Sequence, residues 1–239
     1  MGGLAQKFNE VLQKELNLHA AWFPITNTFQ IGDFGLFDDG LFRTVGNIKR
    51  DYPEIELVID KGTEASIDFK SDGTSMQSLN ANGEAATLGS LGNADAKLLF
   101  KFTQENSMVL KAKMTSDELK NIDEVGRKLS LKDSWNKKYK VVSTVYNGEG
   151  SVIICSKEAG TEISISAAAN VLKQVEGGKV DGALQIQSNK QSVFSSIGET
   201  GIIGLRFFKL KWLGQGVSVL AETQGEVEVE KDVINDDDF

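Results

Sequence analysis

Residues 96–102, AKLLFKF, decide the fold class, because apolar residues stand at every second position and, apart from Leu99, lysines fill the places between them. This period of two is typical of a β-strand with one buried face and one wet face. The pattern recurs upstream in residues 65–70, ASIDFK, and downstream in residues 162–166, EISIS. Strands that follow one another with few helices between them favour an antiparallel sheet, since parallel strands need crossover helices.

We therefore predict an α+β fold: a large twisted antiparallel sheet with an N-terminal amphipathic helix and one or two short central helices. The N-terminal helix is expected at residues 5–18, where the apolar residues follow helical spacing on one side. A central helix is expected from Thr115 through Val125, because Thr115 and Glu118 have the spacing of a capping box. A further helical turn or two is expected at residues 129–135.

Glycine-containing segments predict the breaks between strands. Residues 147–150, NGEG, are expected to form a hairpin turn between strands at 139–146 and 151–156, and residues 198–201, GETG, to form another turn. Residues 54–60 alternate apolar and acidic positions apart from Val58, which predicts a half-buried strand. Residues 71–93 are small and polar, and we expect a long loop or a weak extension of the flanking strands.

The charge of the 239-residue chain is uneven. The formal net charge is -8, and from Glu222 to the end Lys231 is the only basic residue. We predict one α+β domain over residues 1–222 and an acidic, disordered tail over residues 223–239. The acidic balance argues against a general nucleic-acid coat, although the body before the tail is close to neutral and leaves room for a basic face.

The sequence offers no assembled catalytic or metal site, so we expect a non-enzymatic protein without a metal or cofactor. His19 is the only histidine, which excludes paired-histidine zinc motifs, and the acidic residues lack metal-ligand spacing. Cys155 is the only cysteine and stands in an apolar run, which favours a buried small side chain over a reactive thiol. The absence of disulfide pairs, of a secretory signal and of a long apolar segment favours the cytoplasm.

Two strand–loop–strand units suggest a first function, which is membrane insertion. Residues 63–102 and 151–187 each combine alternating strands with small, weakly hydrophobic segments. Membrane-spanning hairpins need about ten alternating residues in each arm, apolar toward lipid and polar on the other side. An ordinary antiparallel sheet with long hairpins explains the same alternation.

The order of these segments resembles the pore-forming domain of bacterial gasdermins. The likeness lies in the N-terminal segment, the alternating hairpin before a helical middle, and the late stretch 180–212, in which a polar strand leads into residues 198–208, GETGIIGLRFF. The resemblance implies a cytoplasmic effector of bacterial defence that is held inactive by its C-terminal segment, then meets membrane lipid and forms an oligomer. The side chains expected to face lipid are Ile67, Phe69, Leu98, Phe100, Ile163 and Ile165.

A second function is single-stranded DNA binding. The last residues, Asp236, Asp237, Asp238 and Phe239, resemble the partner-binding tails of single-stranded DNA-binding proteins. Aromatic residues among cations could stack on bases and neutralise phosphates. The candidates are Trp135, Lys138, Tyr139, Arg206, Phe207, Lys209 and Trp212. Core packing of the aromatic residues is the alternative explanation, and an interaction or scaffold protein is a third interpretation.

Overall fold

The structure is a computed structural model, and it describes residues 2–62, 64–80, 82–87, 96–167, 172–173, 184–210 and 217–220. The acidic tail predicted at residues 223–239 lies outside this range, as does Trp212. The predicted division into one domain and a tail therefore stays a prediction.

The chain is strand-rich with few helices, as the sequence predicts. The helices are α1 (Gly2–Leu16), α2 (Ile48–Asp51) and α3 (Ile122–Ser130). The strands in the first half of the chain are β1 (His19–Ala20), β2 (Asp33–Asp38), β3 (Leu41–Asn47), β4 (Ile59–Lys61), β5 (Ala65–Lys70), β6 (Thr74–Leu79), β7 (Lys97–Phe102) and β8 (Ser107–Leu119). Those in the second half are β9 (Lys140–Ser156), β10 (Thr161–Ser166), β11 (Gln185–Ser188), β12 (Val193–Leu210) and β13 (Val217–Leu220).

Within the described residues the strands form two antiparallel sheets. The large sheet has nine strands and is built on β9, which pairs with β8 on one side and with β12 on the other. The small sheet has four strands in the order β11-β10-β7-β6. The predicted α+β class with a large antiparallel sheet is confirmed.

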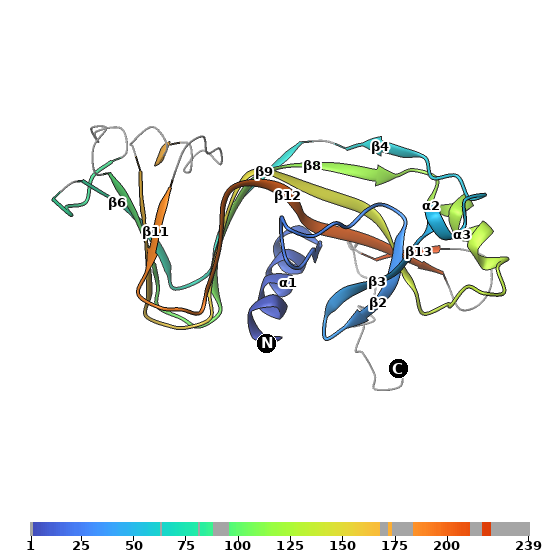
Figure 1. Ribbon diagram of the computed structural model, residues 1–239, viewed down its shortest axis with the longest axis horizontal. Coiled ribbons are helices and arrows are strands. Elements are labelled where there is room, and N and C mark those ends of the chain that lie inside the picture. Colours follow the sequence, from blue (N-terminus) through green and yellow to red (C-terminus); the bar gives the residue numbers. More distant parts are fainter. Residues whose placement is uncertain are drawn as a thin grey trace.

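Figure 1 shows how the layers lie. The long strands β8, β9 and β12 bend downward at the left, and the small sheet stands beside their bent ends. α1 lies under the bend, on the other face of the large sheet, where Phe8 and Leu12 pack against Met108, Leu110 and Cys155. We call this left-hand region, where the small sheet packs on the large one, the folded end.

The opposite end of the large sheet carries α2, α3 and the β2–β3 hairpin (Figure 1). Its core is rich in aromatic rings: Phe34 lies 5.0 Å from Trp135, and Phe42 lies 4.6 Å from Phe207, between ring centroids. α3 contributes Val125 and Leu129 to the same core. We call this region the aromatic end.

The structure corrects the start of the central helix. Thr115 and Glu118 lie inside the long strand β8 rather than in a capping box, and α3 begins at Ile122 after Asn121. The two residues are held by pairing with β9, where Thr115 lies opposite Asn147 and Glu118 opposite Thr144. The expected second helix at 129–135 is also wrong, because α3 ends at Ser130 and turns follow.

Two predicted turns are in fact strand interiors. Residues 147–150 belong to the 17-residue strand β9, and residues 198–201 belong to the 18-residue strand β12. The glycines serve close packing: a Cβ at Gly148 would overlap the Ile203 side chain, and one at Gly201 would overlap the backbone of Ile25. β12 carries register shifts in this region, which let the paired strands bend without a break.

The strand predicted at residues 54–60 is shorter and later than expected. β4 covers only Ile59–Lys61, and Val58 and Ile59 are exposed rather than half-buried. Ile55 is buried in the aromatic end, but it reaches that core from a loop. The connection expected at 71–93 contains a strand, β6, which pairs with β7.

Candidate functional site

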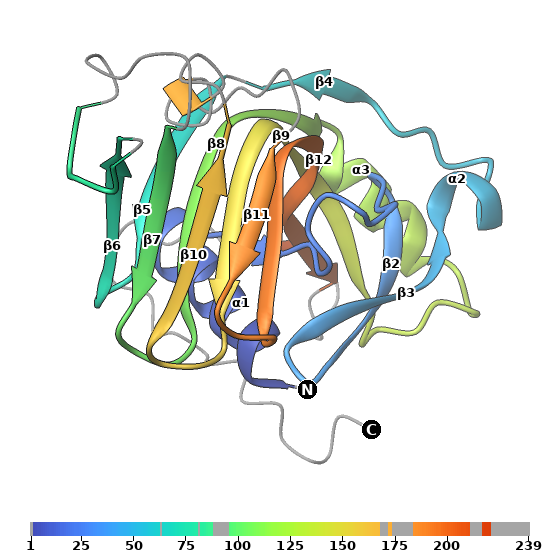
Figure 2. The ribbon, with the colours of Figure 1, turned by 60° about the vertical axis from the view of Figure 1, so that its left-hand side comes forward.

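The small sheet is the continuation of four strands of the large sheet. β5 leads into β6, β7 into β8, β9 into β10 and β11 into β12, each through a turn of three or four residues. In the large sheet these strands pair in the order β5-β8-β9-β12, and in the small sheet their continuations pair as β6-β7-β10-β11. Figure 2 shows the four turns side by side at the lower edge, with the small sheet in front. A single four-stranded ribbon is therefore folded over on itself.

Polar side chains hold the turns of this ribbon together. Asn189, between β11 and β12, accepts a hydrogen bond from the Glu162 amide (2.8 Å) and donates one to the Gly160 carbonyl (3.1 Å). Ser156 and Thr161 join the two ends of the β9–β10 turn through their hydroxyls, 2.6 Å apart. Gly160 has a φ of +74°, which favours glycine at this turn.

The layer between the two sheets contains four of the six predicted lipid-facing residues. Leu98 and Phe100 on β7 lie opposite Ile165 and Ile163 on β10, and all four are fully buried. They pack against the inward side chains of the large sheet, Val109, Val152 and Ile154. These four side chains are core residues of the folded end in this structure, and their predicted contact with lipid stays a prediction.

The outer face of the β7–β10 pair is polar apart from the half-buried Leu99. Lys97 and Glu162 are exposed, and Lys101 forms an ion pair with Glu162 across the strands at 3.0 Å. Ser164 and Ser166 lie half-buried beside them, between the buried positions of β10. β10 thus has one apolar and one polar face, and β7 has the same pattern apart from Leu99 on its outer face. This is the pattern that a membrane-spanning strand requires.

The other two predicted residues, Ile67 and Phe69 on β5, lie in a different core. They pack with Met108, Leu110 and the helix α1, on the opposite face of the large sheet from the small sheet. The six residues therefore do not form one surface in this structure. They are divided between the two layers that cover the large sheet.

Counting positions along the chain reveals a relation between these two layers. On β7 and β8 one set of buried residues, divided between the small-sheet layer and the α1 layer, stands at even numbers: Leu98, Phe100, Phe102, Met108, Leu110, Ala112 and Met114. The corresponding set on β10 and β9 stands at odd numbers: Ile153, Cys155, Ile163 and Ile165. Val109 on β8 and Val152 and Ile154 on β9 have the opposite parity, because they face the small sheet from the large one. If the turns straightened, the period of two would bring each set onto one face of its strand, interrupted on the first by Gln104 and Asn106 and on the second by Lys157 and Thr161, with Val109, Val152 and Ile154 on the other face.

The predicted nucleic-acid residues that the structure describes, which exclude Trp212, do not form an exposed stacking surface. Trp135 and Phe207 are buried in the aromatic end, and Tyr139 is half-buried between Phe34 and Trp135. Core packing, the alternative that the sequence left open, describes Trp135 and Phe207. Lys138 is exposed and Lys209 is half-buried.

Arg206 lies apart from the aromatic rings of that core. Its guanidinium carbon lies 5.4 Å from the ring centroid of Tyr146, a cation–π distance. Burial raises the pKa of Tyr146, and the hydrogen bond from Lys120 lowers the pKa of the neighbouring Glu118. The described part of Arg206's surroundings is a charged face of the large sheet rather than a stacking platform.

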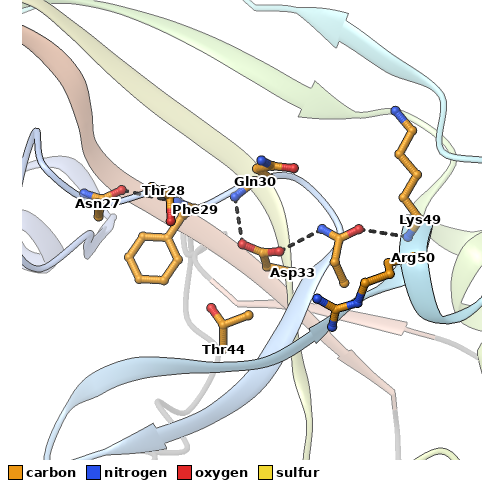
Figure 3. Close-up of a pocket in the computed structure, with 9 residues that line it drawn as sticks. Asn27, Thr28, Phe29, Gln30, Asp33, Thr44, Lys49 and Arg50 are labelled. Carbon is orange, nitrogen blue, oxygen red and sulfur yellow. Dashed lines mark hydrogen bonds between the residues drawn. The ribbon is translucent and has the colours of Figure 1, made fainter.

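Figure 3 shows an open pocket of about 650 Å³ at the base of the β2–β3 hairpin. Its one carboxylate, on Asp33, accepts hydrogen bonds from the Gln30 amide (2.8 Å) and from the Asn47 side chain (2.7 Å). Lys49 and Arg50 stand at the rim, and Arg50 pairs with Asp51 at 2.7 Å. These contacts hold the loop before β2 in place and leave the carboxylate engaged, so the pocket has no poised acid–base pair.

Cys155 and His19, which we considered as a reactive thiol and as a metal ligand, both make packing contacts in the structure. Cys155 is buried, and burial raises the pKa of its thiol to about 12, which disfavours the reactive thiolate. His19 lies between the rings of Phe37 and Phe207, and its Nδ1 lies 3.0 Å from the Gln13 side chain. Among the described residues, no group of His, Cys, Asp and Glu could hold a metal ion, and no helix is long and apolar enough to cross a membrane.

The fold and site together define an α+β protein whose antiparallel sheet is folded over on itself. No protein-family model and no curated protein matches the chain. Among solved structures, the chain is similar to a bacterial gasdermin from Bradyrhizobium tropiciagri, with 14% sequence identity, 90% of each chain covered and a TM-score of 0.39. This match agrees with the resemblance drawn from the sequence. A likeness at this level does not transfer a function, so the activity has to be argued from the chain's own residues.

Proposed function

We propose that this chain is a latent pore-forming protein of the cytoplasm, which unfolds its doubled sheet into a membrane and has no enzymatic activity. The observation that carries the proposal is the ribbon of four strands folded over at four aligned turns. Straightening those turns would convert two buried layers into one long amphipathic sheet without breaking the pairing within either half.

The lengths of the strands fit such a conversion. A membrane-spanning strand needs about 9–11 residues. In the sequence, residues 92–102 and 161–171 each alternate apolar and mostly polar positions over that length. The first segment ends at the turn before β8, and the second begins after the turn that follows β9. Leu98, Phe100, Ile163 and Ile165 would then face lipid, while Lys97, Lys101 and Glu162 would face water.

Burial explains why the protein would remain latent. Before the conversion, the proposed lipid-facing side chains are shielded from solvent. Those on β7 and β10 pack against Val109, Val152 and Ile154, and those on β5 pack against α1 on the other face of the large sheet. Both covers would have to leave before the straightened sheet met a bilayer. We propose that the C-terminal segment, which follows β13, holds the covered form and that its removal starts the conversion.

The strand order suits assembly with further copies. The ribbon has an even number of alternating strands, so identical copies in one orientation could pair β12 of one antiparallel to β5 of the next. In the described part of the chain, residues 193–203 of β12 pair as strands only with β9, and β5 only with β8. Such a head-to-tail contact is heterologous and closes into a ring when its rotation allows. The proposal therefore includes homo-oligomers and membrane lipid as partners.

A cut made after folding tests this function. A sequence-specific protease site placed between Ala221 and Glu222 lets intact protein be purified and then cleaved in the presence of dye-loaded liposomes. We expect no dye release before cleavage and release that depends on protein concentration afterwards, with the same protein lacking the site as the control. Cleaved protein that keeps its circular dichroism spectrum and releases no dye from neutral or anionic liposomes would refute the proposal.

A further inference from the structure

The tip of the β2–β3 hairpin is a tight two-residue turn. Asp39 and Gly40 have φ angles of +51° and +75°, and two consecutive positive φ angles are the mark of the type I′ turn that suits a short hairpin. At its base the hairpin is fixed to the large sheet, because Phe34 pairs with Val141 of β9 and is buried in the aromatic end. The hairpin therefore holds the Asp39 carboxylate and the Gly40 carbonyl out from a fixed base.

Both of these groups accept hydrogen bonds from α1. The Gln6 side chain donates to the Asp39 carboxylate at 2.7 Å, and the Asn9 side chain donates to the Gly40 carbonyl at 3.3 Å. In Figure 2 the tip of the hairpin lies beside the start of the helix. The buried Asn9 side chain also accepts a hydrogen bond from the Ala20 amide at 2.8 Å, so it joins α1 to both β1 and the hairpin.

The contacts come from a polar stripe of α1 that runs beside its apolar face. Gln6, Asn9 and Gln13 follow one another at spacings of three and four residues, which places them on one side of the helix. Gln13 continues the stripe to β1, where its side chain lies 3.0 Å from Nδ1 of His19. Asparagine is a weak helix former, and a buried amide needs hydrogen-bond partners, so these contacts explain the place of Asn9 inside α1.

The contact joins the two ends of the molecule. The hairpin belongs to the aromatic end, whereas α1 packs against Ile67 and Phe69 of β5 at the folded end. Under the proposed function the helix has to leave β5 before the straightened sheet meets a bilayer. The hairpin stays in place meanwhile, so its hydrogen bonds restrain the cover of the end that moves.

We propose that the tip of the β2–β3 hairpin is a catch that holds α1 on the large sheet. Release of its hydrogen bonds to Gln6 and Asn9 is the step that lets the helix leave β5. The role of that step rests on the proposed function, but the hold itself exists in the intact chain without a membrane. The two can therefore be measured separately.

Hydrogen exchange of the intact protein tests the hold. Asp39→Gly removes the carboxylate and supplies a residue that accepts a positive φ, so the turn is kept. We expect the amides of residues 5–16 to exchange about fivefold faster, the effect of losing one net hydrogen bond, while residues 141–145 of β9 stay protected. Asp39→Asn is the matched control, because its side-chain oxygen still accepts from Gln6 and asparagine tolerates the turn. It should leave exchange in α1 unchanged.

A second variant breaks the same contact from the helix side. Gln6→Glu sets two carboxylates against each other, and α1 should again exchange faster. Adding Asp39→Asn to it removes the repulsion and should restore the protection of α1. This pair decides the matter if residues 141–145 lose protection in the Asp39→Gly variant.

A reversible cross-link tests the role of the catch in the conversion. Gln6→Cys with Asp39→Cys, bridged by a short bifunctional methanethiosulfonate, ties α1 to the hairpin. The native Cys155 is buried with its pKa raised to about 12, so the reagent spares it. After cleavage at the site after Ala221, the bridged protein should release no dye from liposomes, and a reductant should restore release. Each single-cysteine variant treated with the same reagent should release dye at least as fast as its parent.

Unchanged exchange in α1 when the contact with Asp39 is broken, or equal dye release with and without the bridge, would overturn the catch. The outcomes also separate the catch from the pore. Faster exchange in α1 with no leakage from any cleaved protein would keep the catch as the restraint on α1 and refute the pore. Leakage after cleavage that ignores the bridge would keep the pore and refute the catch.

Discussion

The two ends of the large sheet bury side chains equally well but cover them in different ways. Phe207 at the aromatic end and Phe100 at the folded end are both fully buried. At the aromatic end the cover comes from separate elements, α3 and the β2–β3 hairpin. At the folded end the cover is the continuation of the same strands, returned by four short turns.

Burial and connectivity therefore carry separate information about the two ends. Burial sets how much free energy a side chain contributes to the folded state. Connectivity decides whether the buried surface can be exchanged for another surface without breaking the sheet. Under the proposed function the folded end would open by straightening its turns, whereas the aromatic end, covered by separate elements, would not take part.

The largest expected effects come from removing a phenylalanine at each end. Phe207→Ala should cost about 3–5 kcal/mol of global unfolding free energy, since large buried rings leave cavities. Phe100→Ala should lower hydrogen-exchange protection in β7 and β10 while leaving residues 141–145 of β9 protected. Equal loss of hydrogen-exchange protection at both ends in both variants would show that the two ends unfold as one cooperative unit, which contradicts the distinction drawn between them.

A charge on either face of β10 should sharpen the comparison next. Ile163→Lys puts a lysine on the proposed lipid face, at a cost of about 2–4 kcal/mol at mid-bilayer, and should abolish dye release after cleavage. Ser164→Lys places the same charge on the neighbouring polar face and should preserve release. Circular dichroism must first show that both variants are folded, because Ile163 is buried in the core of the folded end before any contact with a membrane. Equal dye release by the two folded variants would show that β10 does not insert into the membrane.

The smallest expected effects come from two asparagines that tie segments together, one at each end. Asn189→Ala removes two hydrogen bonds that hold the turns together. It should lower the free energy of unfolding by about 1–2 kcal/mol and accelerate dye release after cleavage. Asn121→Ala removes comparable bonds to the Val58 amide and the Glu56 carbonyl near α3. It should cost a similar amount and leave the release rate unchanged. Faster release from both variants would mean that general destabilisation, rather than the loss of the bonds at the turns, controls opening.

The errors of sequence-based prediction in this chain have a common cause. Thr115 and Glu118 have helix-capping spacing, but pairing along β9 provides more hydrogen bonds than a cap does and holds them in β8. Gly148 and Gly201 look like turn residues, yet each is needed because another segment passes too close for a Cβ. Local signals report what a residue permits, and the tertiary neighbours decide which of the permitted conformations is used.

The six residues that the sequence groups as lipid-facing lie in two layers of this structure, and their contact with lipid stays a prediction. The alternation of β7 and β10 identified Leu98, Phe100, Ile163 and Ile165, and the structure gathers these four in one layer. Ile67 carries the same pattern and lies in the other layer, beside α1. A period of two assigns a residue to a face of its strand, but it cannot say which element covers that face.

The strand-rich class, the N-terminal helix, the concentration of acid at the C-terminus and the two-residue period of the strands all follow from the amino-acid sequence alone. These features are local, because they depend on the chain's own charges and on the geometry of neighbouring residues. Three further features appear only in the folded chain: four strands fold back together, Lys140 lies opposite Lys209, and apolar residues of one parity on a strand are divided between two separate cores. Those facts depend on pairing between residues far apart in the chain, and no local pattern specifies which distant strand provides the partner.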